Sequence, residues 1–496
     1  MNYMDLLKFA APETIIVITA LVVLVADLTA LRELELKFRL IIGGMISSVG
    51  CLAAIGWMLA LPQQANLLEG MLVLDPVVQF VKIALLVLTI FTVLISIERD
   101  FTRHVGEYYA LVLLASLGMM FLISSEDILM IFVSLELTSL SLYILTAFNK
   151  RNAKSAEAAL KYFLFGGMSA AFTLFGLSLL YGLAGATNLG QIASALKGKG
   201  LDPVLVIAIV MTVIGFGFKV AAVPFHLWAP DAYEGAPTPS AALIASGSKL
   251  ASFFIFAKVM MIGFYGVEGS GAWRAYSPGW VPVIAVIAAA SMVLGNLAAI
   301  VQSSVRRLLA YSAIAHAGYV LLAVLSHDKQ NLPSLIYYVV TYGLTTIGAF
   351  GVVAVVQERA GGDRLSDFAG LSRKSPLVAF CMMIFMLSLA GIPPLAGFFG
   401  KFYVFTSAIG TGAKNLGLLW LVILAIGMSA VSLFYYLQVL KQIYIAEPES
   451  TDAPAAPSSV VTQAALALLA LAIVVLGCAP NLLIAKLVSA INLAGL

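Results

Sequence analysis

Long apolar runs constrain this sequence more than any other feature. About fourteen stretches, most of them near 20 residues, consist almost entirely of hydrophobic side chains. A helix of about 20 residues spans roughly 30 Å, which is the thickness of the hydrocarbon core of a bilayer. Backbone polar groups find no water there, so a spanning segment must be a helix or part of a closed barrel. The run lengths favour helices and predict an all-α, polytopic membrane protein.

Composition agrees with this class. Hydrophobic residues make up 61% of the chain and charged residues only 11%, with a mean hydropathy of +1.03. Soluble domains carry roughly 25% charged residues. The net charge of +3 on 496 residues indicates no nucleic-acid partner. No cationic segment precedes the first apolar run, so we expect a retained span rather than a cleaved signal peptide.

We predict fourteen transmembrane helices, followed by a short tail that lies at the surface. The predicted spans are residues 12–31, 39–60, 76–97, 107–125, 127–147, 157–184, 202–230, 236–265, 279–301, 304–325, 331–357, 375–410, 416–443 and 459–480. The proline-containing stretch 447–459 is the predicted linker before the last span.

The distribution of lysine and arginine predicts the orientation. The odd-numbered connections between the predicted spans, counted with the residues at the edges of those spans, hold 15 of the 28 lysine and arginine residues. The even-numbered connections and the two chain ends hold 7. Cytoplasmic loops carry the excess of positive charge. We therefore expect the odd connections in the cytoplasm and both termini on the non-cytoplasmic side of the cell inner (plasma) membrane.

Two spans are unusually long and contain glycine and proline close to a lysine. The seventh contains Gly and Phe residues up to Lys219 and then Pro224, and the twelfth contains the segment 391–394 and then Lys401. Paired broken helices are typical of transporters built from inverted repeats. The sequence therefore predicts that helices 7 and 12 are broken.

The spacing of polar residues supports two inverted five-helix repeats, at about 107–265 and 279–443. Lys219 follows Glu136 by 83 residues, and Lys401 follows His316 by 85. Because each repeat has an odd number of spans, the second is inverted. The predicted segments are 1–106 (three N-terminal helices), 107–265 (first repeat), 266–443 (second repeat) and 444–496 (linker and C-terminal helix).

Ionisable residues inside the spans are candidates for proton transfer, because a central charge costs about 2.5–3.5 kcal/mol on insertion scales. Burial lowers the pKa of a lysine and pairing opposes that shift, so a balanced lysine can exchange protons near neutral pH. The candidates are Glu136, Lys161, Lys219, Lys249, Lys401, His226 and His316.

Each candidate also has a structural interpretation. Glu136 is expected to pair with Lys219 or Lys161, either as a proton-sensitive pair or as a link between helices. Lys161 lies near a span end, where it is either functional or snorkels to the interface. His226 is either a helix cap or a relay, and His316 either a relay or a core residue.

Other polar residues are predicted to have no chemical role. Lys82 and Lys258 are interpreted as snorkelling side chains. Cys51, Cys381 and Cys478 lie far apart without metal-ligand spacing, so they are expected to be small hydrophobic residues. With four histidines in the chain, no haem or iron–sulfur cradle is predicted, and any redox chemistry is expected on another chain.

Four motifs carry a resemblance that covers essentially the whole chain. They begin at Pro224 (PFHLWAPDAYEGAPT), Tyr311 (YSAIAHAGY), Asp367 (DFAGL) and Gly391 (GIPPLAGFFGKF). They resemble the antiporter-like subunits of respiratory complex I (NADH–quinone oxidoreductase). Tyr233, Gly235 and Lys401 are similar to the subunit N family, since subunit M usually has glutamate at the last position. The long lateral helix of subunit L is absent.

This resemblance implies roles for the candidates. Glu136 and Lys219 would form the pair of the first half-channel, Lys249 the central connection and Lys401 the end of the second half-channel. Lys161 resembles a further lysine of the family. The neighbours would be subunits resembling K and M. NADH, FMN, iron–sulfur clusters and quinone would be bound by other subunits, with no cofactor or metal on this chain.

The predicted function is proton translocation through buried Glu, Lys and His residues, coupled to quinone reduction elsewhere in the complex. The chain would be a non-redox subunit of a translocating enzyme. The alternative is a subunit of an Mrp-type cation/proton antiporter. A third possibility is a scaffold whose polar residues only hold helices together.

Overall fold

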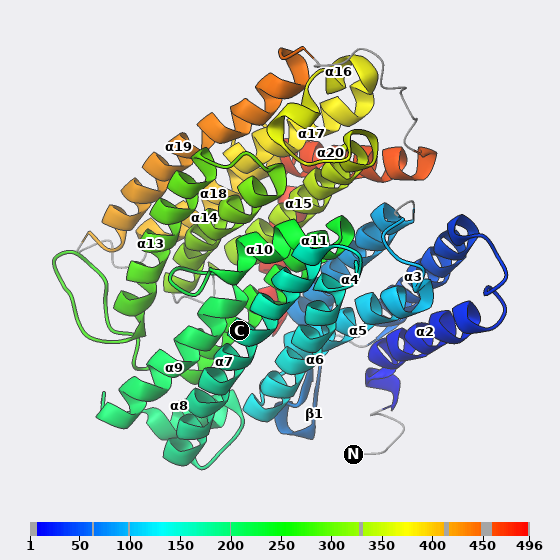
Figure 1. The fold of residues 1–496 in the computed structure, drawn as a ribbon. Coiled ribbons are helices and arrows are strands. Elements are labelled where there is room, and N and C mark those ends of the chain that lie inside the picture. The colour runs from blue at the N-terminus through cyan, green and yellow to red at the C-terminus, as the bar shows by residue number, and fades with distance from the viewer. Residues whose placement is uncertain are drawn as a thin grey trace.

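The computed structural model describes residues 7–61, 64–97, 100–198, 200–326, 331–410, 416–447 and 459–494. Most of the predicted linker 447–459 therefore lies outside the described residues. The chain folds into a bundle of long helices, with α2 and α3 at one edge and α16 and α19 at the opposite edge (Figure 1).

The helices and strands follow in chain order. They are α2 (Ala11–Leu28), α3 (Leu36–Ala60), β1 (Ala65–Leu67), the 3-10 turn Leu68–Gly70, β2 (Leu72–Leu74), α4 (Pro76–Ser96), α5 (Val105–Ser124), α6 (Ile128–Thr146), α7 (Ala153–Ala184), α8 (Leu189–Leu196), α9 (Pro203–Lys219), α10 (Trp228–Gly235), α11 (Thr238–Ala245), α12 (Gly247–Lys258) and the π-turn Val259–Gly263. Then come α13 (Trp280–Ile300), α14 (Val305–Leu325), α15 (Leu332–Ala360), the 3-10 turn Leu365–Phe368, α16 (Leu371–Lys374), α17 (Pro376–Ala390), α18 (Ala396–Gly410), α19 (Leu419–Tyr444), α20 (Val460–Cys478) and α21 (Asn481–Ala494).

The fourteen predicted spans are confirmed in the described residues. Twelve helical segments are long and apolar enough to cross a membrane. The other two spans are the broken ones: α9 with α10 forms the seventh, and α17 with α18 forms the twelfth. The chain is therefore a multi-pass α-helical membrane protein.

Sequence signals fix where many helices begin and end. Asp75, Asp127 and Asp202 cap α4, α6 and α9 by accepting hydrogen bonds from backbone N–H groups of the first turn. Helix α17 ends where Gly391 adopts a left-handed conformation with φ of 86°, which glycine tolerates best. The two prolines that follow prevent the helix from continuing directly into α18.

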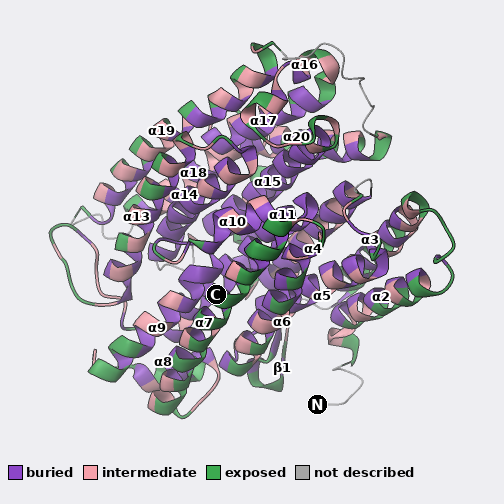
Figure 2. Cartoon of the chain, viewed as in Figure 1, coloured by how far each residue is buried: buried purple, intermediate pink, exposed green. Residues whose placement is uncertain are grey.

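The core of the bundle is formed by its most buried spans. The span Thr238–Gly263 and α15 are buried throughout their most apolar stretch, and α14 is nearly so. Figure 2 shows buried residues along α15 and exposed ones on the outer faces of α2, α3 and α19. Apolar side chains on those outer faces would meet lipid.

The connections gather on two opposite faces, as fourteen alternating spans require. On one face, Arg306 after the ninth span donates hydrogen bonds to Asp363 after the eleventh and to the carbonyl of Ala236 after the seventh. On the other, the N–H of Glu126 after the fourth span donates to Gly70 after the second. We call these the odd face and the even face.

The eighth predicted span contains an interruption that was not predicted. Helix α11 ends and α12 begins around Ser246, within the single membrane-spanning segment Thr238–Gly263. Ser246 donates its hydroxyl to the carbonyl of Ala242. A serine bound to the preceding turn, next to Gly247, is a known cause of helix kinks. The antiparallel pair β1–β2 and the short helix α8 were not predicted either.

The predicted surface tail forms a helix. Helix α21 packs against α4, α15 and α20 through Leu483, Leu487 and Ile491, which are buried at a spacing of four residues. This spacing places them on one helical face. The tail is therefore part of the bundle's packing rather than a loose end.

Candidate functional site

Lys219 lies at the end of α9, where the seventh span is interrupted. Its ammonium group donates a hydrogen bond to the hydroxyl of Ser139 on α6, and that hydroxyl donates to the carbonyl of Leu135. The lysine Nζ is 4.0 Å from Oε1 of Glu136. Glu136 and Ser139 are three residues apart, so they share one face of α6. Helix α6 thus presents a carboxylate and a hydroxyl to one buried ammonium.

The pairing of Glu136 with Lys219 is loose. A distance of 4.0 Å is at the limit of an ion pair and beyond hydrogen-bond length. Oε1 of Glu136 is buried and accepts no hydrogen bond from any described residue. Because a buried carboxylate oxygen without a donor is costly, a small movement of the lysine toward Glu136 would be favourable.

Lys249 lies beside the interruption around Ser246 and is 2% exposed. Its ammonium donates to the backbone carbonyl of Val220, the first residue after α9. That carbonyl has no partner inside its own helix, because the helix ends there. Two lysines from different spans therefore lie at the same helix end. Lys219 is the last residue of α9, and Lys249 donates a hydrogen bond to the carbonyl that follows it.

Lys401 lies in the second half of the twelfth span, and its side chain reaches back across the break. Its Nζ donates to the carbonyls of Leu389 and Ala390, each at 3.0 Å, and to Ser429 Oγ at 2.8 Å. It also lies 5.1 Å from the ring centroid of Tyr319. In contrast to Lys219, which has Glu136 at 4.0 Å, Lys401 forms no ion pair with a described residue, and its hydrogen-bond acceptors are all neutral. Carbonyls freed by the break hold the ammonium.

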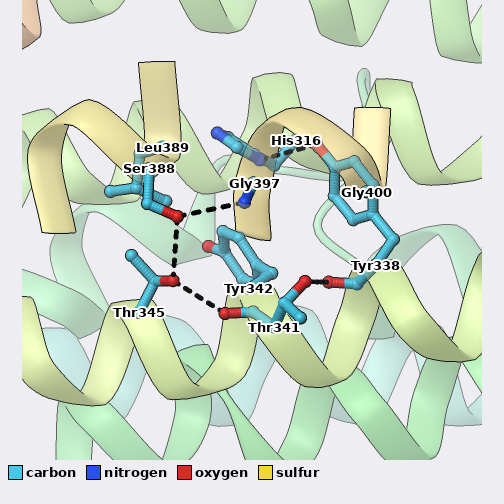
Figure 3. A pocket seen from close by; sticks show the side chains of 9 residues that line it. All are labelled: His316, Tyr338, Thr341, Tyr342, Thr345, Ser388, Leu389, Gly397 and Gly400. Carbon is cyan, nitrogen blue, oxygen red and sulfur yellow. Dashed lines mark hydrogen bonds between the residues drawn. The ribbon is translucent and has the colours of Figure 1, made fainter. Parts of the chain in front are cut away.

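A hydroxyl-lined cavity lies beside this break. His316 donates or accepts at both ring nitrogens, with Tyr338 OH 2.9 Å from Nδ1 and Tyr436 OH 3.2 Å from Nε2. Figure 3 shows His316 and Tyr338 facing a pocket that Leu389 also lines. The pocket has a volume of about 10 Å³, which is roughly the space that one water centre needs. The carbonyl of Leu389, which lines the pocket with His316, accepts a hydrogen bond from Lys401.

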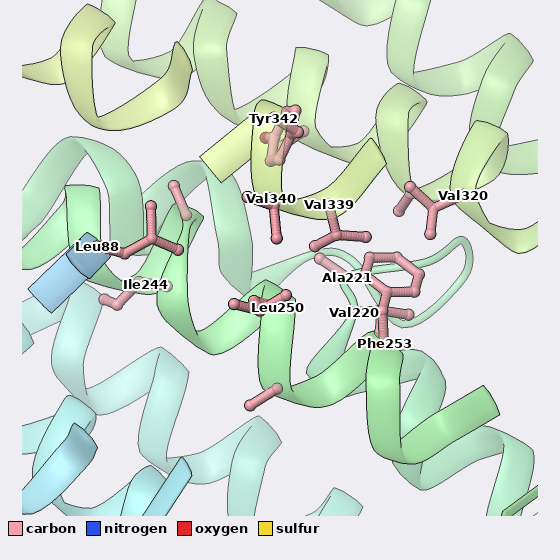
Figure 4. Close-up of a cluster of buried hydrophobic side chains, with 14 of the residues drawn as sticks. Leu88, Val220, Ala221, Ile244, Leu250, Phe253, Val320, Val339, Val340 and Tyr342 are labelled. Atoms are coloured by element: carbon pink, nitrogen blue, oxygen red, sulfur yellow. The ribbon is translucent and has the colours of Figure 1, made fainter. Parts of the chain in front are cut away.

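An apolar cluster borders both polar regions. It packs α12 and the segment after α9 against α14 and α15, as Figure 4 shows. The cluster includes Leu88, Val220, Ala221, Ile244, Leu250, Phe253, Val320, Val339, Val340 and Tyr342. Leu250 follows Lys249 directly, and Tyr342 also lines the cavity at His316. The cluster thus borders Lys249 through Leu250 and the cavity at His316 through Tyr342, and we call it the apolar layer.

Comparison with known proteins places the chain in a family. The profile described as NADH:quinone oxidoreductase/Mrp antiporter, TM, matches residues 125–432. NADH-quinone oxidoreductase subunit N 2 of Acidobacterium capsulatum is 50% identical over 97% of this chain and 98% of its own length. The chain belongs to the NADH-quinone oxidoreductase subunit N family.

Solved structures agree with this membership. A chain of respiratory complex I from Thermus thermophilus with bound aureothin is 32% identical, with a TM-score of 0.77 over 96% of this chain and 99% of that one. A chain of the Mrp complex from Dietzia sp. has a TM-score of 0.81 over 98% of both chains, at 21% identity. The second likeness shows that the fold is shared, and only that.

The expected pairing of Lys161 with Glu136 is not found. Lys161 instead bonds to Asp231 at 2.8 Å and to Glu157 at 2.7 Å, and its side chain is 40% exposed. It lies in the third turn of α7, close to the odd face, where Asp231 of α10 is within reach and Glu136 is not. The lysine therefore belongs to a surface charge network.

That network was not predicted from the sequence. Arg307 at the start of α14 donates to Asp231 and Glu234, each at 2.9 Å, and Glu234 also pairs with Lys154 at 2.8 Å. Three helices, α7, α10 and α14, are joined in this way. Asp231 and Glu234 lie within the motif beginning at Pro224, three residues apart on one helical face, which is the signal that could have revealed them.

The snorkelling interpretation of Lys82 and Lys258 was wrong. Lys82 is 1% exposed and bonds to Glu13 of α2 at 2.5 Å. Lys258 is 4% exposed, and its Nζ lies 2.9 Å from Oε1 of Glu126. A partner carboxylate on a neighbouring segment made burial possible, and partners distant in sequence are not visible from local pattern.

His226 is not brought together with the other candidates. It lies in the connection between α9 and α10, it is 7% exposed, and its Nδ1 has no hydrogen-bond partner in the described part of the chain. Helix α10 begins without a side-chain cap, so the capping interpretation fails. Among the described residues, no group of three or more His, Cys, Asp or Glu side chains could hold a metal ion.

A first prediction concerns Asp363 on the odd face. Burial alone would raise the pKa of its carboxyl, but the charge and hydrogen bond of Arg306 outweigh burial, so the pKa lies below its usual value. The charged form thus stabilises the fold above the unfolded pKa near 4, and this contribution is lost as pH falls through the lower folded value.

Arg306→Gln should therefore destabilise the protein by about 2 kcal/mol at pH 7, because it leaves a half-buried carboxylate unpaired. Thermal unfolding of the detergent-solubilised protein measures this. The difference from the parent should shrink as pH falls below about 4 and through the lower folded pKa of Asp363. The control is Arg373→Gln, which removes an exposed arginine that forms no ion pair with a described residue. Equal stability of the two variants at pH 7 would contradict the assignment.

Proposed function

We propose that this chain is a proton-translocating subunit in the membrane arm of an NADH–quinone oxidoreductase. The observation that carries the proposal is that Lys219, Lys249 and Lys401 are all buried, each beside an interruption in a membrane-spanning helix. A buried lysine is expensive inside a bilayer unless it has a function. Carbonyls at helix breaks can stabilise an ammonium and orient water without a fixed counter-charge.

The proposed proton-carrying groups are the candidates that the structure places in the buried polar regions. Glu136, Lys219 and Lys249 would act on one side of the apolar layer, and His316 and Lys401 on the other. When protonated, Lys249 would donate a hydrogen bond to the Val220 carbonyl at the end of α9. Lys161, in the surface network, and His226, whose Nδ1 has no hydrogen-bond partner among the described residues, have weaker structural support for a place in the relay.

We also propose the division into segments 1–106, 107–265, 266–443 and 444–496. In each repeat the second span carries a titratable residue, Glu136 on α6 or His316 on α14, and the fourth span is broken and carries a lysine. This correspondence supports two repeats of one architecture.

The chain would supply no redox step. NADH oxidation and quinone reduction would occur on other subunits, and this chain would respond to them through its neighbours in the membrane. Subunits resembling K and M are the proposed neighbours. The Mrp-type antiporter remains the alternative class, since the matched profile covers both classes and the fold is shared, but 50% identity with a subunit N relative favours the oxidoreductase.

The test is proton pumping by the whole complex in sealed vesicles, with Lys249→Ala in this chain. We expect NADH-driven pumping to be lost, since no other buried cation bonds to the Val220 carbonyl among the described residues. Lys486→Ala, at a position in the C-terminal helix, is the control. Unimpaired pumping by Lys249→Ala would contradict a proton-carrying role for this lysine.

A further prediction concerns orientation. Both termini and the even face are proposed to lie outside the inner membrane, with the odd face in the cytoplasm. Cys51 and Cys381 are buried but Cys478 is exposed, so Cys478→Ala must come first. In that background, Ser366→Cys on the odd face should resist an impermeant thiol reagent in right-side-out vesicles, whereas Ser194→Cys should react. The opposite pattern would reverse the topology.

A further inference from the structure

A large basic cavity opens on the odd face, away from the buried lysines. Its volume is about 760 Å³. Its walls come from the start of α3, the segment before α5 and the turn between α6 and α7. The cations that line it are Arg39, Arg103, Lys150 and Arg151, with Asp100 as the acidic side chain.

Three of these cations have no partner among the residues that the structure describes. Arg39 is neutralised by Asp27, which accepts from its guanidinium at 2.8 and 2.7 Å. The side chains of Arg103, Lys150 and Arg151, in contrast, form no ion pair or hydrogen bond with any described residue, and all three are exposed. Unpaired positive charges around one concave space attract an anion. Helices α3 and α5 also begin here without side-chain caps, which adds partial positive charge.

The surroundings indicate that the anion is attached to a lipid. Leu36 and Arg39, which line the cavity, belong to the first turns of α3. Beginning in the same turns, α3 exposes Phe38, Met45 and Leu52. These residues are seven apart, so they form one apolar stripe along the helix. A headgroup in the cavity would leave its acyl chains lying along this stripe. A free anion has no apolar part that could pack against the stripe.

We propose that the cavity binds the phosphate headgroup of an anionic phospholipid at the membrane interface. A phosphate diester offers oxygen acceptors to arginine and lysine donors. A zwitterionic headgroup would bring its own cation next to Arg103, Lys150 and Arg151, so net negative charge is required. Basic pockets between helices at the cytoplasmic surface are suited to such headgroups.

The test uses the complete complex extracted from membranes and reconstituted into vesicles. The probes are a photoactivatable phosphatidylglycerol and a phosphatidylcholine carrying the same photoreactive headgroup spacer. Cross-linked peptides are identified by mass spectrometry. We expect the phosphatidylglycerol probe to label segments 36–39, 100–104 and 149–151, and the phosphatidylcholine probe to label them weakly.

The decisive variant combines Arg103→Gln, Lys150→Gln and Arg151→Gln. Each cation near a membrane surface contributes roughly five-fold to anionic-lipid binding, so labelling at limiting probe should fall about 100-fold. The matched control, Arg373→Gln with Lys374→Gln and Lys441→Gln, removes three cations from the same face outside the cavity and should label normally. If the triple variant fails to assemble, each single variant should still lose roughly five-fold.

Several results would overturn the proposal. Equal labelling by both probes would show that charge does not select the lipid. Unchanged labelling of the triple variant would show that these cations do not bind it. Complete protection by millimolar inorganic phosphate, with the same effect in detergent without lipid, would assign the cavity to a free anion. Cross-links from these segments to an acidic segment of another subunit would assign it to a protein contact.

Discussion

Lys401→Arg is expected to abolish proton pumping while leaving the protein folded. Arginine keeps its proton because its pKa lies above about 12, so it cannot release one in each cycle. The lysine ammonium is held by the carbonyls of Leu389 and Ala390 and by Ser429. No carboxylate is among these acceptors. A role as a fixed counter-charge would therefore need a partner that the described structure does not provide at this position.

Size is the confounding factor, because the guanidinium is bulkier than the ammonium and the site is 95% buried, with Lys401 only 5% exposed. Lys401→Ala is therefore needed as well, since it removes both charge and crowding. Both variants should assemble, because single buried changes seldom exceed a few kcal/mol. Lys441→Arg, at an exposed position on α19, is the control for expression. The measurement is protons pumped per NADH oxidised in vesicles. Normal pumping by Lys401→Arg would exclude proton release by this residue.

The second large effect is expected from the pair Glu136 and Lys219. Glu136→Gln removes the anion 4.0 Å from the ammonium, which disfavours the protonated lysine. Lys219→Ala removes the ammonium itself. Each single change should impair pumping severely, and the double variant should be little worse than either one, because the two residues act as a coupled pair.

The measurement is a double-mutant cycle on NADH-driven proton uptake. Combining Glu136→Gln with Arg373→Gln, at an exposed position on the odd face, provides the reference for independent effects. Ser139→Ala adds a further distinction, because the hydroxyl accepts the lysine hydrogen bond. If its loss brings Lys219 to Glu136, coupling should strengthen. Independent, multiplicative effects of Glu136→Gln and Lys219→Ala would argue against a functional pair.

Much of the fold could be predicted because its signals are local. Apolar runs, caps and the Gly-Pro interruptions near Lys219 and Lys401 lie in continuous stretches of sequence. The break around Ser246 could not be predicted in the same way, since Ser-Gly-Ser also occurs inside continuous helices. The break depends on the hydrogen bond from the Ser246 hydroxyl to the Ala242 carbonyl. Whether that bond forms is decided by the surrounding packing.

The candidate site was only partly predictable for a similar reason. A lysine in an apolar run is conspicuous, but the groups that hold it are not. Nothing in the local sequence marks Ser139 and Ser429 as partners of a lysine. Their role depends on a lysine from another span that donates a hydrogen bond to each hydroxyl. Asp231, which pairs with Lys161, and Glu13, which pairs with Lys82, lie 70 and 69 residues away in sequence. Pairing over such separations is decided by tertiary structure.

The apolar layer between Lys249 and His316 has an electrical consequence (Figure 4). Moving one elementary charge across 100 mV of membrane potential releases about 2.3 kcal/mol, so a permanently wet route between the two faces would short-circuit the membrane. Leu250, Phe253, Val339 and Val340 are buried and offer no polar side-chain group to such a route. Under the proposed function, proton transfer between the two polar regions would require these side chains to separate, and their packing would limit the leak between turnovers.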